Sequence, residues 1–138
     1  MSIQTVGVVG AGTMGNGIAQ ACAVRGINVV MVDIQEAAVQ RGLATIGGSL
    51  DRLIKKEKMT AAEKDAALAR VNGTTDYGAL KSAQLVIEAA TESEPLKLKI
   101  LAQLDGLLDS ATIIATNTSS ISITKLAAAT KRADRFIG

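Results

Sequence analysis

The chain has 138 residues, a hydrophobic content of 48% and a net charge of +2, which suits one domain because a single domain usually has roughly 100–200 residues. With this small charge, one tyrosine, one phenylalanine and no tryptophan, we expect no nucleic-acid partner, since such partners favour basic patches and aromatic stacking platforms. No apolar run approaches the ~20 residues needed to cross a bilayer, and no signal-peptide pattern opens the chain, so we expect no membrane partner and a cytoplasmic location.

A glycine-rich turn links the first two expected elements. A strand-like run, Ile3 to Val9, precedes this turn, and a helix-like stretch, Asn16 to Arg25, follows it. The three glycines of the turn meet separate steric needs: a tight strand-to-helix turn, close approach of a pyrophosphate to bare backbone, and packing of helix on sheet. The free N–H groups and positive dipole of the helix start favour binding of an anion. The candidate cofactor-binding residues of the turn are Gly10, Ala11, Gly12, Thr13, Met14 and Gly15.

Cys22, on this first expected helix, is the only cysteine of the chain. A single cysteine excludes an intramolecular disulfide and a cysteine-based metal cluster, and we expect no metal site. Its small apolar neighbours, Ala21, Ala23 and Val24, favour a buried core thiol over a reactive one.

A second strand-like run, Asn28 to Val32, ends directly before Asp33. Asp33 follows Gly12 at about the 20-residue spacing at which dinucleotide-binding domains place the carboxylate that binds a ribose diol. The same carboxylate repels a 2′-phosphate, and the next three residues, 34–36, include no guanidinium that would offset this repulsion. We therefore expect the cofactor to be NAD rather than NADP.

The segment from Gln35 to Val71 predicts two consecutive helices, a helical hairpin, where a short crossover would suffice. The second helix opens with Thr60 and Glu63 at the spacing of a capping box. In the first, hydrophobic residues recur at steps of four and three and so share one helical face: Val39, Leu43, Ile46, Leu50 and Leu53. Three glycines inside that helix each destabilise it by about 1 kcal/mol relative to alanine: Gly42, Gly47 and Gly48.

The remaining elements alternate between strands and helices. Aliphatic runs predict strands at Leu85 to Ile87 and Ile113 to Ala115, more weakly at Val71 to Thr75, and the start of another at Arg135 to Ile137. Between the two clear strands, Glu94 to Leu108 predicts a helix with one apolar stripe. This alternation indicates parallel βαβ units. The predicted fold is therefore α/β, a doubly wound, mostly parallel Rossmann sheet over residues 1–138, with the helical hairpin, residues 35–71, inserted between strands two and three.

Three segments of the chain resemble the 3-hydroxyacyl-CoA dehydrogenase family. The first is the glycine turn, in which Met14 precedes the third glycine. The second is the end of the expected strand at 85–87 and the residues after it, where two glutamates and a lysine have the same spacing as in the family: Glu88, Glu92 and Lys97. The third is the sequence Asn-Thr-Ser-Ser at 117–120, after the last clear strand. The long helical hairpin is also similar to this family, so the resemblance runs from residue 3 to the end of the chain.

The resemblance implies an NAD-dependent oxidoreductase that converts L-3-hydroxyacyl-CoA, such as 3-hydroxybutyryl-CoA, to 3-ketoacyl-CoA in fatty acid and butanoate metabolism. It implies that Glu92 and Lys97 lie against the nicotinamide half of NAD, that Ala90 also binds the cofactor, and that Asn117 lies near the nicotinamide ribose. It places Ser119 where the cofactor meets the substrate, as a residue that binds the cofactor and as the catalytic residue that donates a hydrogen bond to the 3-oxygen of the substrate, where charge develops. On pattern alone, Asn117 and Ser119 also fit a polar strand-to-helix turn with caps.

The resemblance further implies an acyl-CoA substrate that contacts the hairpin. Ser49, Arg52 and Lys56 are the candidate contacts for the adenosine phosphate end of coenzyme A, with Ser119 at the acyl end. On composition alone, the charged stretch 52–58 fits equally a solvated hairpin end, and each exposed contact contributes little.

The chain contains no histidine. Removing the proton of the alcohol needs a base that titrates near neutrality, and histidine is the unperturbed choice. In the family, a histidine follows a strand similar to 136–138, and its glutamate partner and an all-helical C-terminal domain, which forms a homodimer, lie further on. We therefore expect this chain to be the N-terminal NAD-binding part of such an enzyme, without turnover by itself. One alternative is a stand-alone redox-sensing module that binds a dinucleotide. Another is a hydroxyisobutyrate- or phosphogluconate-type dehydrogenase domain, which would not explain the long helical hairpin.

Overall fold

The structure, a computed structural model, describes residues 3–90, 94–116 and 136–137. Its centre is a parallel sheet of six strands in the order β3-β2-β1-β4-β5-β6. The strands are β1 (Thr5–Val9), β2 (Asn28–Val32), β3 (Val71–Thr74), β4 (Leu85–Glu88), β5 (Ile113–Thr116) and β6 (Phe136–Ile137). This order confirms the predicted doubly wound sheet, including its weaker third strand.

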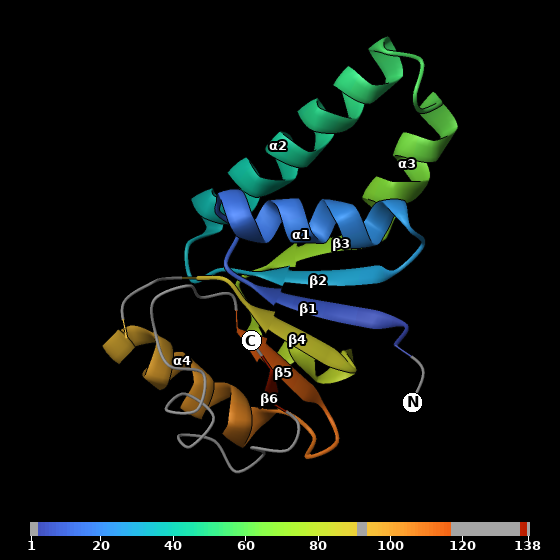
Figure 1. The fold of residues 1–138 in the computed structure, drawn as a ribbon. Helices are drawn as coiled ribbons and strands as arrows, with labels where there is room; N and C mark the ends of the chain where they lie inside the picture. The colour runs from blue at the N-terminus through green and yellow to red at the C-terminus, as the bar shows by residue number, and fades with distance from the viewer. Residues whose placement is uncertain (1–2, 91–93, 117–135, 138) are drawn as a thin grey trace.

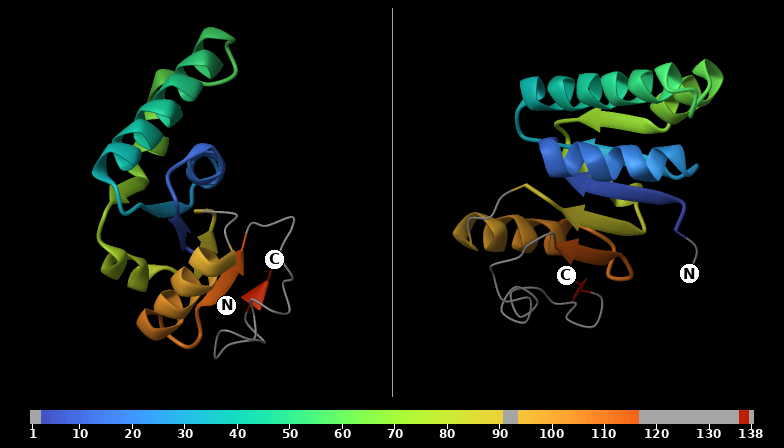
Figure 2. Two further views of the ribbon diagram at one scale, coloured as in Figure 1. Left: turned by 90° about the vertical axis from the view of Figure 1, so that its left-hand side faces the viewer. Right: turned by 45° about the horizontal axis from the view of Figure 1, so that its top comes forward.

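Helices cover both faces of the sheet. The helices α1 (Thr13–Val24), α2 (Glu36–Lys55) and α3 (Ala61–Ala69) lie on one face, and α4 (Glu94–Leu107) lies on the other, as Figures 1 and 2 show. A 3-10 helix, η1 (Tyr77–Ser82), leads from β3 to β4. None of the helices within the described ranges is long and apolar enough to cross a membrane.

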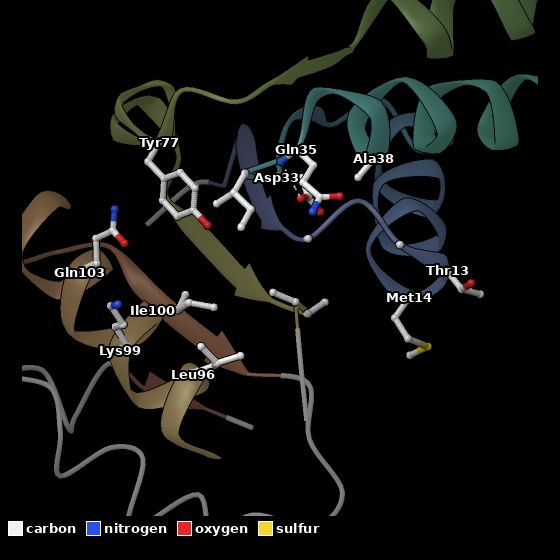
Figure 3. A pocket seen from close by; sticks show the side chains of 15 residues that line it. Thr13, Met14, Asp33, Gln35, Ala38, Tyr77, Leu96, Lys99, Ile100 and Gln103 are labelled. Carbon is white, nitrogen blue, oxygen red and sulfur yellow. Dashed lines mark hydrogen bonds between the residues drawn. The ribbon is translucent and has the colours of Figure 1, made fainter. Parts of the chain in front are cut away.

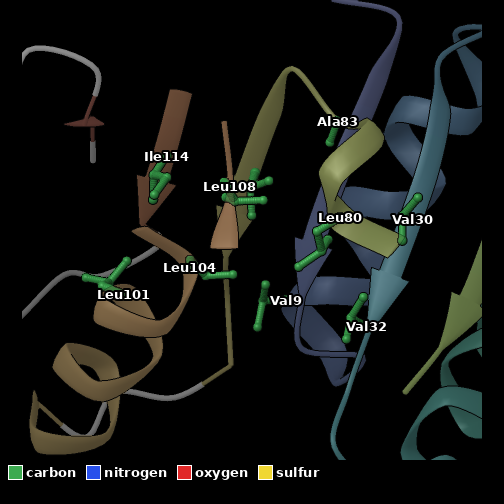
Figure 4. Packing of buried hydrophobic residues seen from close by; sticks show 10 residues of the cluster. Val9, Val30, Val32, Leu80, Ala83, Leu101, Leu104, Leu108 and Ile114 are labelled. Carbon is green, nitrogen blue, oxygen red and sulfur yellow. The ribbon is translucent and has the colours of Figure 1, made fainter. Parts of the chain in front are cut away.

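Two hydrophobic clusters hold these layers together, one on each face of the sheet. Alternate residues of a strand point to opposite faces, so Val29 and Met31 of β2 join the cluster under α1 to α3, whereas Val30 and Val32 join the cluster under α4 and η1. Figure 4 shows this second cluster, in which Leu101 and Leu104 of α4 lie on one side and Leu80 of η1 on the other, with strand residues such as Val9 between them. Strands that are buried on both faces explain the continuous aliphatic runs in the sequence.

The helical hairpin of α2 and α3 extends beyond the sheet, as Figure 1 shows. Its predicted apolar face is confirmed: Val39, Ile46 and Leu50 are buried, and Leu43 and Leu53 pack partly against the same cluster. The predicted capping box is also present. The Thr60 hydroxyl accepts a hydrogen bond from the Glu63 N–H, and the Glu63 carboxylate accepts one from the Thr60 N–H, both at 3.1 Å.

Two local expectations need correction. The first helix begins at Thr13 rather than at Asn16, because Gly12 is its N-cap and the end of the glycine turn already has helical geometry. Cys22 is only partly buried, at the edge of the cluster under α1, and burial still raises the pKa of its thiol.

Candidate functional site

A cavity of about 710 Å³ opens at the carboxyl edge of the sheet. The strand order reverses between β1 and β4 at this edge, and doubly wound sheets bind their ligands at such a reversal. Figure 3 shows Asp33 and Gln35 on one side of the cavity, with Lys99, Ile100 and Gln103 of α4 on the other. The predicted cofactor residues that line it are Gly10, Gly12, Thr13, Met14, Asp33 and Ala90.

The glycine turn fits closely against its surroundings on one side and is open on the other. Gly10 has a positive φ of 108°, and a Cβ there would lie 2.8 Å from the Cα of Ala90. A Cβ on Gly15 would collide with the carbonyl oxygen of Gly10, so α1 approaches β1 only because this residue is glycine. A Cβ on Gly12 would meet nothing within 4 Å. The turn therefore exposes bare backbone to the cavity at Gly12.

The first turn of α1 favours an anion. Its N-cap, Gly12, provides no side-chain hydrogen bond to the end of the helix, and no acidic residue lies in the first turn. The first N–H groups of a helix have no partner within the helix, and the helix dipole adds a partial positive charge at this end. Since Thr13 and Met14 line the cavity, these groups meet the requirements for binding a pyrophosphate.

Asp33 is fixed by two backbone hydrogen bonds. Its Oδ2 atom accepts from the Ala11 N–H at 3.0 Å, and its Oδ1 atom accepts from the Gln35 N–H at 3.1 Å. The carboxylate thus connects the glycine turn to the start of α2. Each carboxylate oxygen has a second lone pair, so Asp33 keeps the capacity to accept hydrogen bonds from the hydroxyl groups of a ribose.

Lys97, predicted to contact the nicotinamide half of the cofactor, does not line the cavity. It is fully buried between α4 and the sheet, where its Nζ atom forms an ion pair with Glu88 and lies 3.3 Å from the Thr116 hydroxyl. Glu88 is fully buried as well. Direct contact between Lys97 and the cofactor therefore stays a prediction.

Several residues that line the cavity were not expected from the sequence. Tyr77 of η1 points into it (Figure 3), and burial, with further contributions from Asp33 and Glu88, raises the pKa of its phenol. Ile34 is 77% exposed beside the cavity. A second face of α4 also lines it, with the helical spacing of three and four that could have identified this face: Leu96, Lys99, Ile100 and Gln103.

The candidate coenzyme A residues lie on α2 (Ser49 and Arg52) and directly after it (Lys56, its C-cap), separate from this cavity. Ser49 accepts a hydrogen bond from Gln20 of α1 at 3.0 Å, whereas Arg52 and Lys56 are exposed. A smaller hollow of about 200 Å³ lies between the start of α1 and α2, and Arg41 and Thr45 line its α2 side. The remaining predicted residues, Glu92, Asn117 and Ser119, lie outside the described residues.

The strand order, the uncapped start of α1 and the carboxylate at the end of β2 define a Rossmann domain that binds a dinucleotide. The sequence profile of the family described as "3-hydroxyacyl-CoA dehydrogenase, NAD binding domain" matches residues 5–138. The chain belongs to this family, as its NAD-binding domain. The match sets aside a hydroxyisobutyrate- or phosphogluconate-type domain.

Comparisons with individual proteins agree with the family. The chain is 46% identical to 3-hydroxybutyryl-CoA dehydrogenase of Bradyrhizobium diazoefficiens, over 99% of this chain and 46% of that protein. It is 39% identical to the fatty acid oxidation complex subunit alpha of Acinetobacter baylyi, over 99% of this chain and 19% of that protein. The crystal structure of (S)-3-hydroxybutyryl-CoA dehydrogenase from Ralstonia eutropha matches with a TM-score of 0.97 and 70% identity, over 98% of this chain and 48% of that one. The chain thus spans about half the length of the 3-hydroxybutyryl-CoA dehydrogenases that it matches.

Proposed function

We propose that this chain holds NAD for a dehydrogenase that oxidises a 3-hydroxyacyl-CoA to the 3-ketoacyl-CoA, or catalyses the reverse reaction. The observation that carries the proposal is the arrangement around the cavity, where Asp33 is hydrogen-bonded to the glycine turn and the start of α1 stands open. The names of the relatives, which are 3-hydroxybutyryl-CoA dehydrogenases and a fatty acid oxidation subunit, support the substrate class.

The residues of the cavity fit NAD. The open backbone at Gly12 leaves room for a pyrophosphate, and the first N–H groups of α1 would bind it. Asp33 would accept hydrogen bonds from the adenosine ribose, and its charge disfavours the 2′-phosphate of NADP. Ile34, Tyr77 and Ile100 offer apolar surface for the adenine ring. When bound, NAD accepts a hydride from the substrate carbon, or its reduced form donates one.

The substrate contacts remain proposals that the family resemblance supports. Ser119 would donate a hydrogen bond to the 3-oxygen of the substrate, which favours the charge that develops on that oxygen. Asn117 and Glu92 would lie near the nicotinamide half of the cofactor. A cytoplasmic location and a homodimer of the longer relatives also stay predictions.

The coenzyme A end of the substrate would bind along α2. Ser49 and Arg52, three residues apart, share one face of this helix, and Lys56, its C-cap, continues that spacing by four residues. The smaller hollow lies beside the glycine turn, and Arg41 and Thr45 of the same helix line it. Two exposed cations on this face suit a phosphate, although each exposed contact contributes only about 1 kcal/mol or less.

Calorimetry with the 138-residue chain tests the cofactor role. We expect NADH to bind and NADPH to bind at least about tenfold more weakly, because the Asp33 carboxylate repels the extra phosphate. Equal binding of both would contradict the role of Asp33, and binding of neither would overturn the proposed function. Because the chain contains no histidine, we expect no turnover of acetoacetyl-CoA. Reduction of this ketone needs a group that gives a proton to the 3-oxygen, the same group that acts as the base in the reverse reaction, so steady oxidation of NADH by this chain would show that it carries such a group.

The same method tests the coenzyme A contacts. Replacing both Arg52 and Lys56 by alanine should weaken acetoacetyl-CoA binding by about three- to tenfold and leave NADH binding unchanged. Lys81→Ala is a single-charge control, since it removes an exposed positive charge from η1, which packs on the opposite face of the sheet from α2. If the control weakens acetoacetyl-CoA binding as much as the double variant does, the positive charge acts non-specifically and the assigned contacts are wrong.

A further inference from the structure

A buried polar network lies behind the cavity, at the carboxyl ends of β4 and β5. Its centre is Glu88, the last residue of β4, which is fully buried. The Oε1 atom of Glu88 accepts hydrogen bonds from the Lys97 ammonium and, at 2.8 Å, from the Thr116 hydroxyl. Its Oε2 atom accepts from the Ala90 N–H at 2.8 Å. Both oxygens of this carboxylate are therefore engaged inside the protein.

The network connects three elements that are distant in the sequence. Glu88 and Thr116 are register partners at the ends of two neighbouring strands, and Lys97 belongs to the first turn of α4. The side chain of Thr116 is also nearly fully buried. Glu88 thus holds the exit of β4, the exit of β5 and the start of α4 at fixed positions relative to one another.

The network also reaches the glycine turn through Ala90. Ala89 and Ala90 line the cavity, and a Cβ on Gly10 would lie 2.8 Å from the Ala90 Cα and 2.9 Å from the Ala89 carbonyl oxygen. The exit of β4 and the glycine turn therefore touch across the backbone. Since Glu88 accepts a hydrogen bond from the Ala90 N–H, this carboxylate fixes the position of the backbone that lines the β4 side of the cavity.

Stability alone does not explain such a network. Burying a carboxylate and an ammonium removes both from water, and well-packed apolar residues of similar volume are often equally stabilising. Apolar side chains in place of Glu88, Lys97 and Thr116 would fill the same space, but they would not fix the Ala90 N–H. Because Ala90 lines the cavity, a buried carboxylate that accepts its N–H also fixes the position of the backbone there.

The order of the strands indicates which part of the cofactor depends on this network. Asp33 follows β2 and the glycine turn follows β1, so the adenosine ribose and the pyrophosphate occupy that side. In the order β2-β1-β4-β5, the other half of a dinucleotide must extend over the ends of β4 and β5. The network lies at these two strand ends.

We propose that Glu88 is a positioning residue, which fixes the β4 exit and α4 through Ala90, Lys97 and Thr116 so that the cavity accepts the nicotinamide half of the cofactor. This role rests on the NAD-binding function proposed above. Glu88 acts through the backbone and side chains that it holds, and its own carboxylate lies outside the cavity lining.

The test compares the binding of NADH with that of ADP, which has the adenosine and diphosphate but lacks the nicotinamide half. In Thr116→Val, which keeps the shape of the side chain and removes its hydroxyl, NADH affinity should fall by about tenfold or more. The same fall is expected for Glu88→Gln, while ADP affinity should change by less than about twofold in both variants. Thr116→Ser restores the hydroxyl and should restore NADH binding.

Thr112→Val is the matched control, because Thr112 is also a buried threonine beside β5, but at the opposite end of that strand. Its hydroxyl bonds to the Ala83 carbonyl oxygen at 3.4 Å, so its loss should lower thermal stability without changing the ratio of NADH to ADP affinity. Unchanged NADH binding in both Thr116→Val and Glu88→Gln, or equal loss of NADH and ADP, would overturn the positioning role alone. Absence of NADH binding in the unmodified chain would overturn the cofactor role itself.

Discussion

Alanine substitutions at Gly42 and Gly47 should have opposite effects on stability, although both glycines lie inside α2. Alanine is more favourable than glycine within a helix by about 1 kcal/mol. A Cβ on Gly47 would meet nothing within 4 Å, so nothing offsets this gain. We therefore expect Gly47→Ala to raise the free energy of unfolding by about 1 kcal/mol.

Gly42 has a different environment, because α2 packs there against the glycine turn. A Cβ on Gly42 would lie 2.8 Å from the Ala11 carbonyl oxygen, 3.1 Å from the Met31 Cε atom and 3.3 Å from the Ala11 Cβ. The Met31 side chain can move aside, but the Ala11 oxygen is backbone of the turn. Overpacking costs ~1–3 kcal/mol, and because the obstacle at 2.8 Å is backbone, we expect a cost in the upper part of this range, above the helical gain of ~1 kcal/mol. The expected net effect of Gly42→Ala is a loss of up to about 2 kcal/mol.

Urea unfolding followed by far-UV circular dichroism measures both changes, provided that the dependence on urea stays the same for the three proteins. Because the Ala11 N–H binds Asp33, Gly42→Ala should also weaken NADH binding, whereas Gly47→Ala should not. A Gly42→Ala variant that is as stable as the unmodified chain and binds NADH equally well would refute the close packing of α2 on the turn.

Three further outcomes follow from individual side chains. Asp33→Asn should weaken NADH binding by about tenfold or more and reduce the difference in affinity between NADH and NADPH. Asp65→Asn, an exposed control on α3, should do neither. Tighter NADH binding in Asp33→Asn would contradict the ribose contact. Burial, with the charges of Asp33 and Glu88, raises the pKa of Tyr77 above its ordinary value of 10.0, so the folded state keeps the phenol proton longer than the unfolded state does. The contribution of Tyr77 to stability should therefore be constant below that ordinary value and fall as the pH rises through the folded pKa, and Tyr77→Phe should remove this part of the fall. A phenolate absorbance titration at the ordinary pKa would disprove the shift. Burial also raises the pKa of the Cys22 thiol, so a thiol reagent should modify it more slowly in the folded chain than in urea, and equal rates would show that the thiol is accessible.

The sequence predicts the centre of the sheet well because β1 and β2 are buried on both faces. Runs such as Val29 to Val32 leave no alternative to a central strand, and the weak third strand is confirmed as the neighbour of β2. The capping box at Thr60 and Glu63 is equally local, since both partners lie within one helical turn. Features whose partners lie close in the sequence could thus be predicted from it.

Lys97 shows where this local reasoning ends. A lysine on an expected helix is normally exposed, and nothing near it in the sequence indicates burial. Its partners, Glu88 and Thr116, come from two strands that only the folded sheet brings together. The tight contact at Gly42 is hidden for the same reason, because the sequence shows the cost of a glycine in a helix but not the backbone that it approaches.

The cavity is likewise only partly predictable. The glycine turn and Asp33 follow a spacing that is set by the chemistry of the ligand, whereas Tyr77 and the second face of α4 line the cavity because η1 and α4 happen to border the same sheet edge. Direct cofactor or substrate contacts of Ser49, Arg52, Lys56 and Lys97 stay predictions, as does the extent of the domain over residues 1–138.

The fluorescence of the one tyrosine can report on binding at the cavity, because this tyrosine lines it. Without tryptophan in the sequence, ultraviolet-excited emission comes from Tyr77, whose ring borders the cavity. A reduced nicotinamide cofactor bound nearby absorbs in the range where tyrosine emits, so it should quench this fluorescence by energy transfer. Occupancy of the site could thus be followed in real time, without a label.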